Sequence, residues 1–133
     1  MSRHMSCSLT VDAVRERRKK VTRRHVDTWR TLKAGDRLTL VEKAMGLPKG
    51  AQQVVLAEVE IVNARLEPLW LGMTLAEIVT EGFDPDTFAP CNPATEAQVT
   101  AAWCQWWAAT HGYDIARWTE IMCRRIEWRY LNG

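Results

Sequence analysis

The chain lacks the features that mark secreted, membrane-spanning or cofactor-dependent proteins. It has only four cysteines, which lie far apart and form no CxxC pair, so we expect mostly buried, reduced thiols rather than disulfides. No apolar run reaches the length of about eighteen residues that a membrane-spanning helix needs. The motifs GxxxxGK[ST], GxGxxG and HExxH are also missing, and no histidines or cysteines have the spacing of zinc ligands. We therefore expect no metal, no cofactor and no membrane partner.

The length and composition are typical of one small domain. The chain has 133 residues, of which 47% are hydrophobic, and this is enough to form a core without disulfides. The N-terminal residues have neither the apolar stretch nor the cleavage site of a secretory signal. We expect a soluble, cytoplasmic protein with a single domain over residues 1–133, in which residues 1–6 form a flexible tail.

Positive charge is concentrated near the N-terminus. Residues 1–35 contain ten Lys or Arg against three acids, whereas residues 36–133 contain eight against thirteen. Seven of the ten residues 15–24 are basic. Such a local excess favours a nucleic acid, a nucleotide or an acidic protein as partner. The charge alone does not choose among them, and a solvated helix end is the structural alternative.

The hydrophobic pattern predicts an α+β domain. Alternating apolar and polar residues predict strands over residues 37–42, 54–66 and 121–131. Thr10 is placed as the N-cap of a helix that ends near residues 18–20. Thr74 begins a short helix that stops at Gly82, and a longer helix is expected over residues 94–110. No parallel βαβ spacing is present.

Three short motifs follow one another along the chain. They are Lys19-x-x-Thr22-x-Arg24, Gly35-Asp36-Arg37-Leu38 at the start of a predicted strand, and Glu81-Gly82-Phe83 after the long middle strand. In order, spacing and predicted context they resemble the ASCH domain of the PUA-like superfamily, over most of residues 7–131. The sequence departs from the family pattern at Arg17, where the family often has glycine.

The resemblance implies a small β-barrel of mostly antiparallel strands flanked by helices, related to modules that bind RNA in a cleft beside the barrel. We therefore expect RNA or modified-nucleoside binding through a basic cleft, with a strong salt dependence. Trp29 directly follows the basic segment and is the preferred wall for base stacking. The expected phosphate contacts are Arg18, Lys20, Arg23 and Arg24.

The resemblance also suggests an enzyme. Some ASCH proteins look like amidohydrolases that cleave acylated cytidine with a Lys, Thr and Glu set, and others are reported as ribonucleases; by motif, the set here is Lys19, Thr22 and Glu81. A threonine hydroxyl needs a base, which a partly desolvated lysine supplies, and the glutamate would pass a proton to the leaving amine. The alternatives are a phosphate-binding lysine, a satisfied strand hydroxyl and a paired helix-end carboxylate.

The sequence supports two further expectations, one about the core and one about function. Trp103, Trp106 and Trp128 fit the periodicity of buried faces, so we assign them to the core. A third class of function, besides nucleic-acid binding and hydrolysis, is a protein-interaction domain whose basic face docks an acidic partner.

Overall fold

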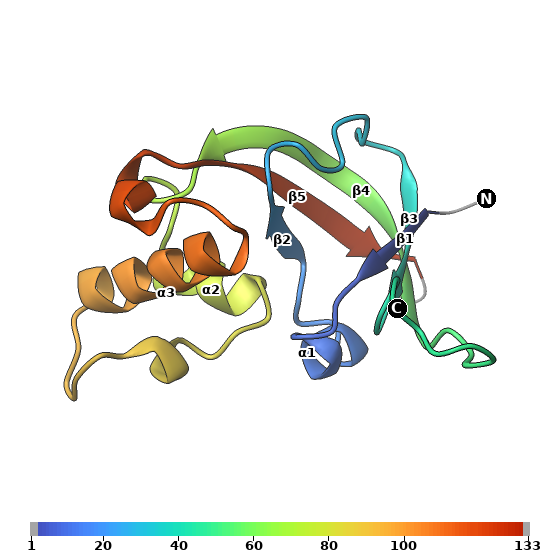
Figure 1. Cartoon of the computed structure of the whole chain (residues 1–133), viewed down its shortest axis with the longest axis horizontal. Coiled ribbons are helices and arrows are strands. Elements are labelled where there is room, and N and C mark those ends of the chain that lie inside the picture. Colours follow the sequence, from blue (N-terminus) through green and yellow to red (C-terminus); the bar gives the residue numbers. More distant parts are fainter. Residues whose placement is uncertain (1–2, 132–133) are drawn as a thin grey trace.

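The computed structural model describes residues 3–131 and shows one curved five-stranded sheet with helices packed at one end (Figure 1). The strands are β1 (Arg3–Ser6), β2 (Val21–Arg24), β3 (Arg37–Val41), β4 (Val55–Pro68) and β5 (Met122–Tyr130). Their order in the sheet is β1-β3-β4-β5-β2. Only the β1–β3 pair is parallel, and the other three pairs are antiparallel.

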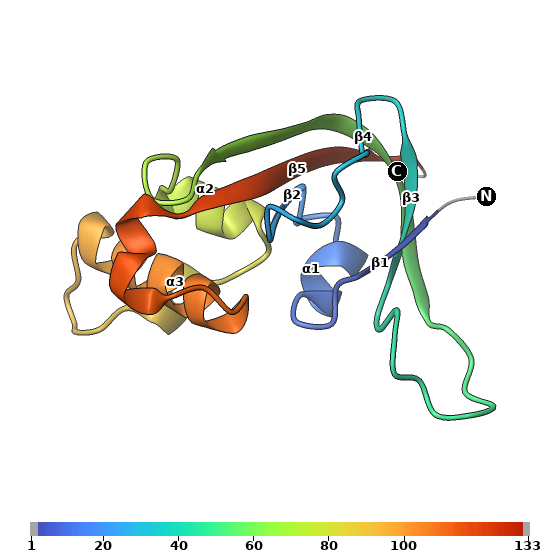
Figure 2. The ribbon, with the colours of Figure 1, turned by 45° about the horizontal axis from the view of Figure 1, so that its top comes forward.

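The helices lie mainly at one end of the two long strands, β4 and β5. They are α1 (Val11–Arg15), α2 (Leu75–Thr80) and α3 (Glu96–Thr110), together with the 3-10 helices η1 (Pro85–Phe88) and η2 (Ile115–Glu120). Helices α2 and α3 cover that end of the sheet, whereas α1 lies below the arch of β4 and β5 (Figure 2). Among residues 3–131, no helix has both the length and the apolar character needed to cross a membrane.

The sheet curls but does not close. Val62 is an extra residue on β4, because the register with β5 shifts between Ile61 and Asn63, and such a bulge bends a strand and increases its twist. Strands β1 and β2 are left as the two free ends of the sheet. The Arg24 side chain bridges them, since its Nη2 donates a hydrogen bond to the carbonyl of Ser6 at 2.7 Å.

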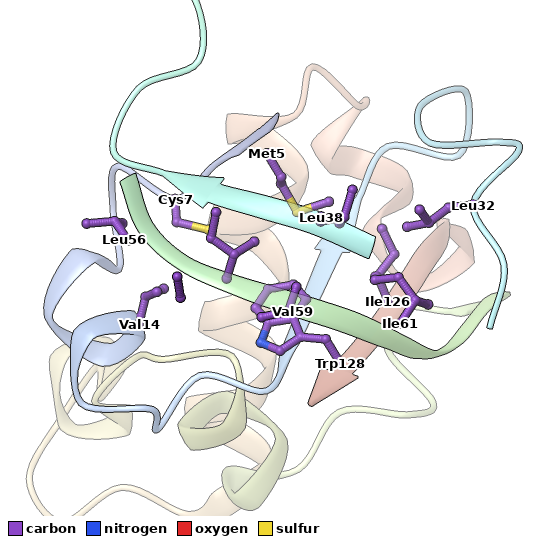
Figure 3. Packing of buried hydrophobic residues seen from close by; sticks show 12 residues of the cluster. Met5, Cys7, Val14, Leu32, Leu38, Leu56, Val59, Ile61, Ile126 and Trp128 are labelled. Carbon is purple, nitrogen blue, oxygen red and sulfur yellow. The ribbon is translucent and has the colours of Figure 1, made fainter. Parts of the chain in front are cut away.

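The buried apolar residues form two clusters, and β5 contributes to both. The first fills the inside of the curled sheet and includes Met5, Leu38, Val59, Ile61, Ile126 and Trp128 (Figure 3). The second lies under α2 and α3 and includes Leu69, Ile78, Trp103, Cys104, Trp107 and Cys123. Trp103 and Trp128 are fully buried, as expected, but Trp106 is only half-buried.

Side-chain capping explains where α2 and α3 begin, whereas Thr10 at the start of α1 makes no side-chain capping bond. Thr74 accepts a hydrogen bond from the Glu77 amide at the start of α2, as predicted. A reciprocal pair of bonds between Thr95 and Gln98 forms a capping box that begins α3. Three of the four cysteines are buried and Cys91 is exposed, which agrees with the expectation of mostly buried thiols.

Two sequence-based predictions about the N-terminal region are wrong. The first helix ends at Arg15 rather than near residues 18–20, because Arg17 adopts a positive φ of 62° that an α-helix cannot continue through. The tail predicted over residues 1–6 is in part a strand: Arg3–Ser6 pairs with β3, and Met5 on it is fully buried. Residues 1–2 of that tail lie outside the described residues.

The fold class is therefore a mixed α+β domain built on a curled, mostly antiparallel half-barrel. The three strands predicted from alternation correspond to β3, β4 and β5. Strand β1 pairs with β3, and β2 pairs with β5, so β1 and β2 form the two edges of the sheet. Arg24 spans the gap between these edges. That gap contains the candidate site.

Candidate functional site

A pocket of about 160 Å³ opens between the two free edges of the sheet. Its walls come from the segment after β1, from β2, from the end of α2 and from the C-terminal half of α3. The lining residues are Ser6, Cys7, Ser8, Leu9, Thr10, Lys19, Thr22, Arg23, Arg24, Glu81, Phe83, Trp106, Trp107, Thr110 and His111. A cavity of about 150 Å³ holds a benzene ring, so this pocket has room for one six-membered ring.

Lys19 and Glu81 form the buried floor of the pocket. The Lys19 ammonium lies 3.6 Å from Glu81 Oε1 and donates a hydrogen bond to the Glu81 carbonyl, and each side chain is only 3% exposed. Burial is the main cause that lowers the pKa of Lys19, and the negative charge of Glu81 opposes that shift. Lys19 is thus a lysine that loses its proton more readily than one in solvent.

Glycine at position 82 explains how Glu81 reaches this floor. Gly82 ends α2 with a φ of +98°, a conformation that L side chains rarely adopt. A Cβ there would lie 3.0 Å from Ala13 Cβ and 3.1 Å from Thr10 Cγ2. The end of α2 can therefore pack directly against α1, and this contact carries Glu81 inward toward Lys19.

Arg23 was expected to contact phosphate, but the structure places it inside the fold. Its buried guanidinium forms ion pairs with three carboxylates: Glu67 at 3.1 Å, Glu77 at 2.6 Å and Glu81 at 3.0 Å. Burial acts to lower the pKa of Arg23, but the charges of Glu81 and Glu77 outweigh it and raise that pKa. A guanidinium already bound by three carboxylates is not free to bind phosphate, so its role is to orient Glu81.

Thr22 and Arg24 both line the pocket, as the alternation of a strand predicts. The Arg24 Nε donates to the Thr22 hydroxyl oxygen at 3.3 Å, and Arg24 Nη2 donates to the Ser6 carbonyl. Burial lowers the pKa of Arg24 from its usual value. The Thr22 hydroxyl therefore lies inside the pocket and beside a positive charge.

An aromatic wall faces these polar groups, and the sequence-based reasoning missed it. The Trp107 and His111 rings stack at a centroid distance of 4.0 Å. His111 Nδ1 lies 2.8 Å from the Trp107 carbonyl, which can only accept, so Nδ1 carries the hydrogen and Nε2 of the neutral ring is an acceptor. Burial lowers the pKa of His111 and keeps that ring neutral near pH 7. The i, i+4 spacing of the two residues was the available signal.

Three other expected site residues lie outside the pocket. Arg18 is exposed and pairs with Glu16 at 2.9 Å. Lys20 projects from another surface of the same segment and borders a different groove. Trp29 packs against the first apolar cluster, with the Arg3 guanidinium 5.3 Å from its ring centroid. The expected basic cleft is thus not one continuous surface.

The pocket combines a hydroxyl, an amine, a carboxylate and an imidazole, each with different hydrogen-bonding and proton-transfer properties. Within residues 3–131, no three His, Cys, Asp or Glu side chains come close enough together to hold a metal ion. The chemistry available from the chain itself is therefore hydrogen bonding, ring stacking, proton transfer and nucleophilic attack.

Comparisons with known proteins bear on the fold alone. No family model and no curated protein matches the sequence. The structure is similar to the crystal structure of protein EF3133 from Enterococcus faecalis V583, from the family DUF984, with a TM-score of 0.59 and 12% sequence identity. The similarity covers 98% of this chain and 80% of that chain. At such low identity the shared feature is the arrangement of strands and helices.

Proposed function

We propose that the protein binds a single nucleoside, or one unpaired modified base of an RNA, in the pocket between the two sheet edges, as an ASCH-like domain of the PUA-like superfamily would. The observation that carries this proposal is the meeting of Lys19, Thr22 and Glu81 in one pocket. These residues come from segments up to 62 residues apart in the chain, and the resemblance to the ASCH domain names the same three.

The polar groups of the pocket match the edge of a nucleobase. Such an edge presents both hydrogen-bond acceptors and donors. Lys19 and Arg24 supply donors for carbonyl oxygens and ring nitrogens, whereas His111 Nε2 supplies an acceptor for an amino group. The Trp106 and Trp107 side chains offer an apolar wall, and unpaired bases are commonly bound against aromatic residues.

The distribution of basic residues favours one base over a run of phosphates at this pocket. Arg23 is held by three carboxylates, and Arg18 and Lys20 do not line the pocket. Lys19 is neutralised in part by Glu81. A long polyanion would therefore find few free cations in the pocket, whereas a neutral heterocycle would not need them.

Hydrolysis of an N-acylated nucleoside is the second candidate. Two observations favour it: the pKa of Lys19 is lowered mainly by burial, and the Thr22 hydroxyl lines the same pocket. Neutral Lys19 would accept the Thr22 proton as Oγ bonds to the acyl carbon. The C–N bond would break as the leaving amine takes a proton from the Lys19–Glu81 pair, and water would then release the acyl group as a carboxylic acid.

The experiment uses calorimetric titration and chromatography of nucleosides, including N4-acetylcytidine, with the wild-type protein and a Thr22→Val variant. Valine keeps the β-branched shape that suits a strand and removes only the hydroxyl. Thr39→Val is the matched control, because Thr39 is a buried strand threonine outside this pocket.

The outcomes separate the two candidates. Binding of nucleosides that is weakened by Thr22→Val, but not by Thr39→Val, supports the pocket as the binding site. Release of cytidine by the wild type and by Thr39→Val, but not by Thr22→Val, establishes hydrolysis through Thr22. Absence of both binding and turnover over all nucleosides would overturn the proposal.

A further inference from the structure

A second groove, of about 340 Å³, lies outside the pocket, and neither proposed function uses it. It is lined by Arg17, Lys20, Trp128, Arg129 and Tyr130. The first two residues come from the connection between α1 and β2, and the other three come from the end of β5. Three of these five residues are cations, so the groove is basic.

Lys19 separates this groove from the pocket. Its ammonium lines the pocket, whereas its carbonyl accepts hydrogen bonds from Trp128 Nε1, at 3.0 Å, and from the Tyr130 hydroxyl. Both of these donors belong to residues of the groove. The two cavities therefore lie on opposite sides of one well-anchored peptide segment, and a variant in the groove need not disturb the pocket.

Arg17 is held in the groove in an unusual way. Its φ of 62° is a left-handed conformation, which is unfavourable for a residue other than glycine. Its guanidinium lies 4.9 Å from the Tyr130 ring centroid, and Nη1 donates to the Val14 carbonyl at 3.1 Å. A guanidinium has five N–H donors, and among residues 3–131 the half-buried Arg17 side chain uses only Nη1 for a hydrogen bond. The other donors are therefore available to a ligand.

The groove also has an excess of positive charge. Among residues 3–131, the ion pairs within 4.0 Å include neither Arg17 nor Lys20. Arg129 pairs with Glu60 at 2.7 Å, but the arginine is 61% exposed, and such surface pairs are weak and easily exchanged. An incoming phosphate would meet two unpaired cations and a third that can change partner.

We propose that this groove binds the phosphate backbone of a single-stranded nucleic acid, with Arg17, Lys20 and Arg129 as the phosphate contacts. Sites of this type combine a positively charged groove with flat aromatic or guanidinium surfaces on which bases stack. The Arg17–Tyr130 stack provides such a surface, and an acidic peptide would have no use for it. This groove is separate from the pocket, so binding in it does not depend on what the pocket binds.

The test measures fluorescence anisotropy of a labelled single-stranded RNA of about ten nucleotides, a length within the usual site sizes. The variant carries Arg17→Gly, Lys20→Gln and Arg129→Gln. Glycine is favoured at a positive φ, so the first change removes a side chain and relieves the backbone together. The control variant carries Lys33→Gln, Lys49→Gln and Arg117→Gln, which are exposed positions outside the groove, and it loses the same number of charges.

We expect the groove variant to bind RNA at least about tenfold more weakly than the control variant. We also expect the slope of log K against log salt to become shallower by about 2, because each lost phosphate contact removes about 0.7. Equal affinities of the groove and control variants, with both shown to be folded by circular dichroism, would overturn the proposal. Competition by polyglutamate that equals competition by unlabelled RNA, at matched charge, would also overturn it.

Discussion

Lys19 and Glu81, which are 62 residues apart in the chain, form an ion pair of 3.6 Å that is almost fully buried. Glu81 also binds the buried guanidinium of Arg23 at 3.0 Å and accepts from the Arg23 amide at 3.3 Å. One carboxylate therefore compensates two cations beside the pocket. Removing a partner from a buried pair leaves an uncompensated charge, which is costly in a low-dielectric interior.

Glu81→Gln is expected to lower the free energy of unfolding by about 3–5 kcal/mol, because it leaves Lys19 and Arg23 without this negative charge. The side-chain amide oxygen of glutamine can still accept hydrogen bonds, so the decrease in unfolding free energy reports the loss of the negative charge. Urea unfolding at neutral pH, followed by tryptophan fluorescence, measures it.

The control for this change is Glu16→Gln. Glu16 pairs with Arg18 on the surface, where both side chains are about half exposed, and isolated surface pairs contribute little. We expect its urea midpoint to match that of the wild type. If Glu81→Gln unfolds at the same urea concentration as Glu16→Gln, the buried pair does not stabilise the fold.

Arg24 ties the two sheet edges together, so Arg24→Met is expected to loosen β1. The change keeps an unbranched apolar stem and removes the charged hydrogen bond to the Ser6 carbonyl, a type of bond that contributes about 1.5–3 kcal/mol. Hydrogen exchange in residues 3–6 should then rise about tenfold or more, with little change in β4 and β5. Arg37→Met, on the exposed start of β3, should leave that exchange unchanged.

Much of the sheet was predictable because its strands alternate clearly. The predicted strands match β3, β4 and β5, and Thr74 and Gly82 bound α2 as expected. Strand β1 was missed because it has only four residues and only one of them, Met5, is fully buried. So short a segment shows no clear alternation of apolar and polar residues. The early end of α1 was missed because a positive φ at an arginine leaves no signal in residue type.

The site was only partly predictable for a different reason. Residue type suggested that a run of basic side chains would share one surface, but the turn at Arg17 sends neighbours in different directions. Lys19 faces the pocket, Lys20 borders the outer groove, and Arg23 binds three acids that lie between 44 and 58 residues away. Such long-range pairing depends on tertiary packing, which spacing along the chain does not reveal.

Thiol reactivity should distinguish Cys91 from the other cysteines. Cys91 is exposed, whereas Cys7, Cys104 and Cys123 are buried, and burial raises the pKa of the Cys7 thiol even though Lys19 and Arg24 oppose the shift. A colorimetric disulfide reagent should label one thiol rapidly in the native protein and the rest only on unfolding. Cys91→Ala should remove the rapid phase. Rapid labelling of Cys7 would show that the pocket opens more widely than the structure indicates.

Stability should fall on the alkaline side because Cys104 and Cys123 are buried in the second apolar cluster. Burial is the main cause that raises the pKa of each thiol from 9.0 to about 12. Above about pH 9 the unfolded chain loses these protons while the folded chain keeps them, so the free energy of unfolding should drop by up to about 1.4 kcal/mol per pH unit for each thiol. Urea titrations at several alkaline pH values measure this slope. It should become shallower in a Cys104→Ala, Cys123→Ala double variant but not in Cys91→Ala, and an unchanged slope in the double variant would assign the alkaline loss to other groups.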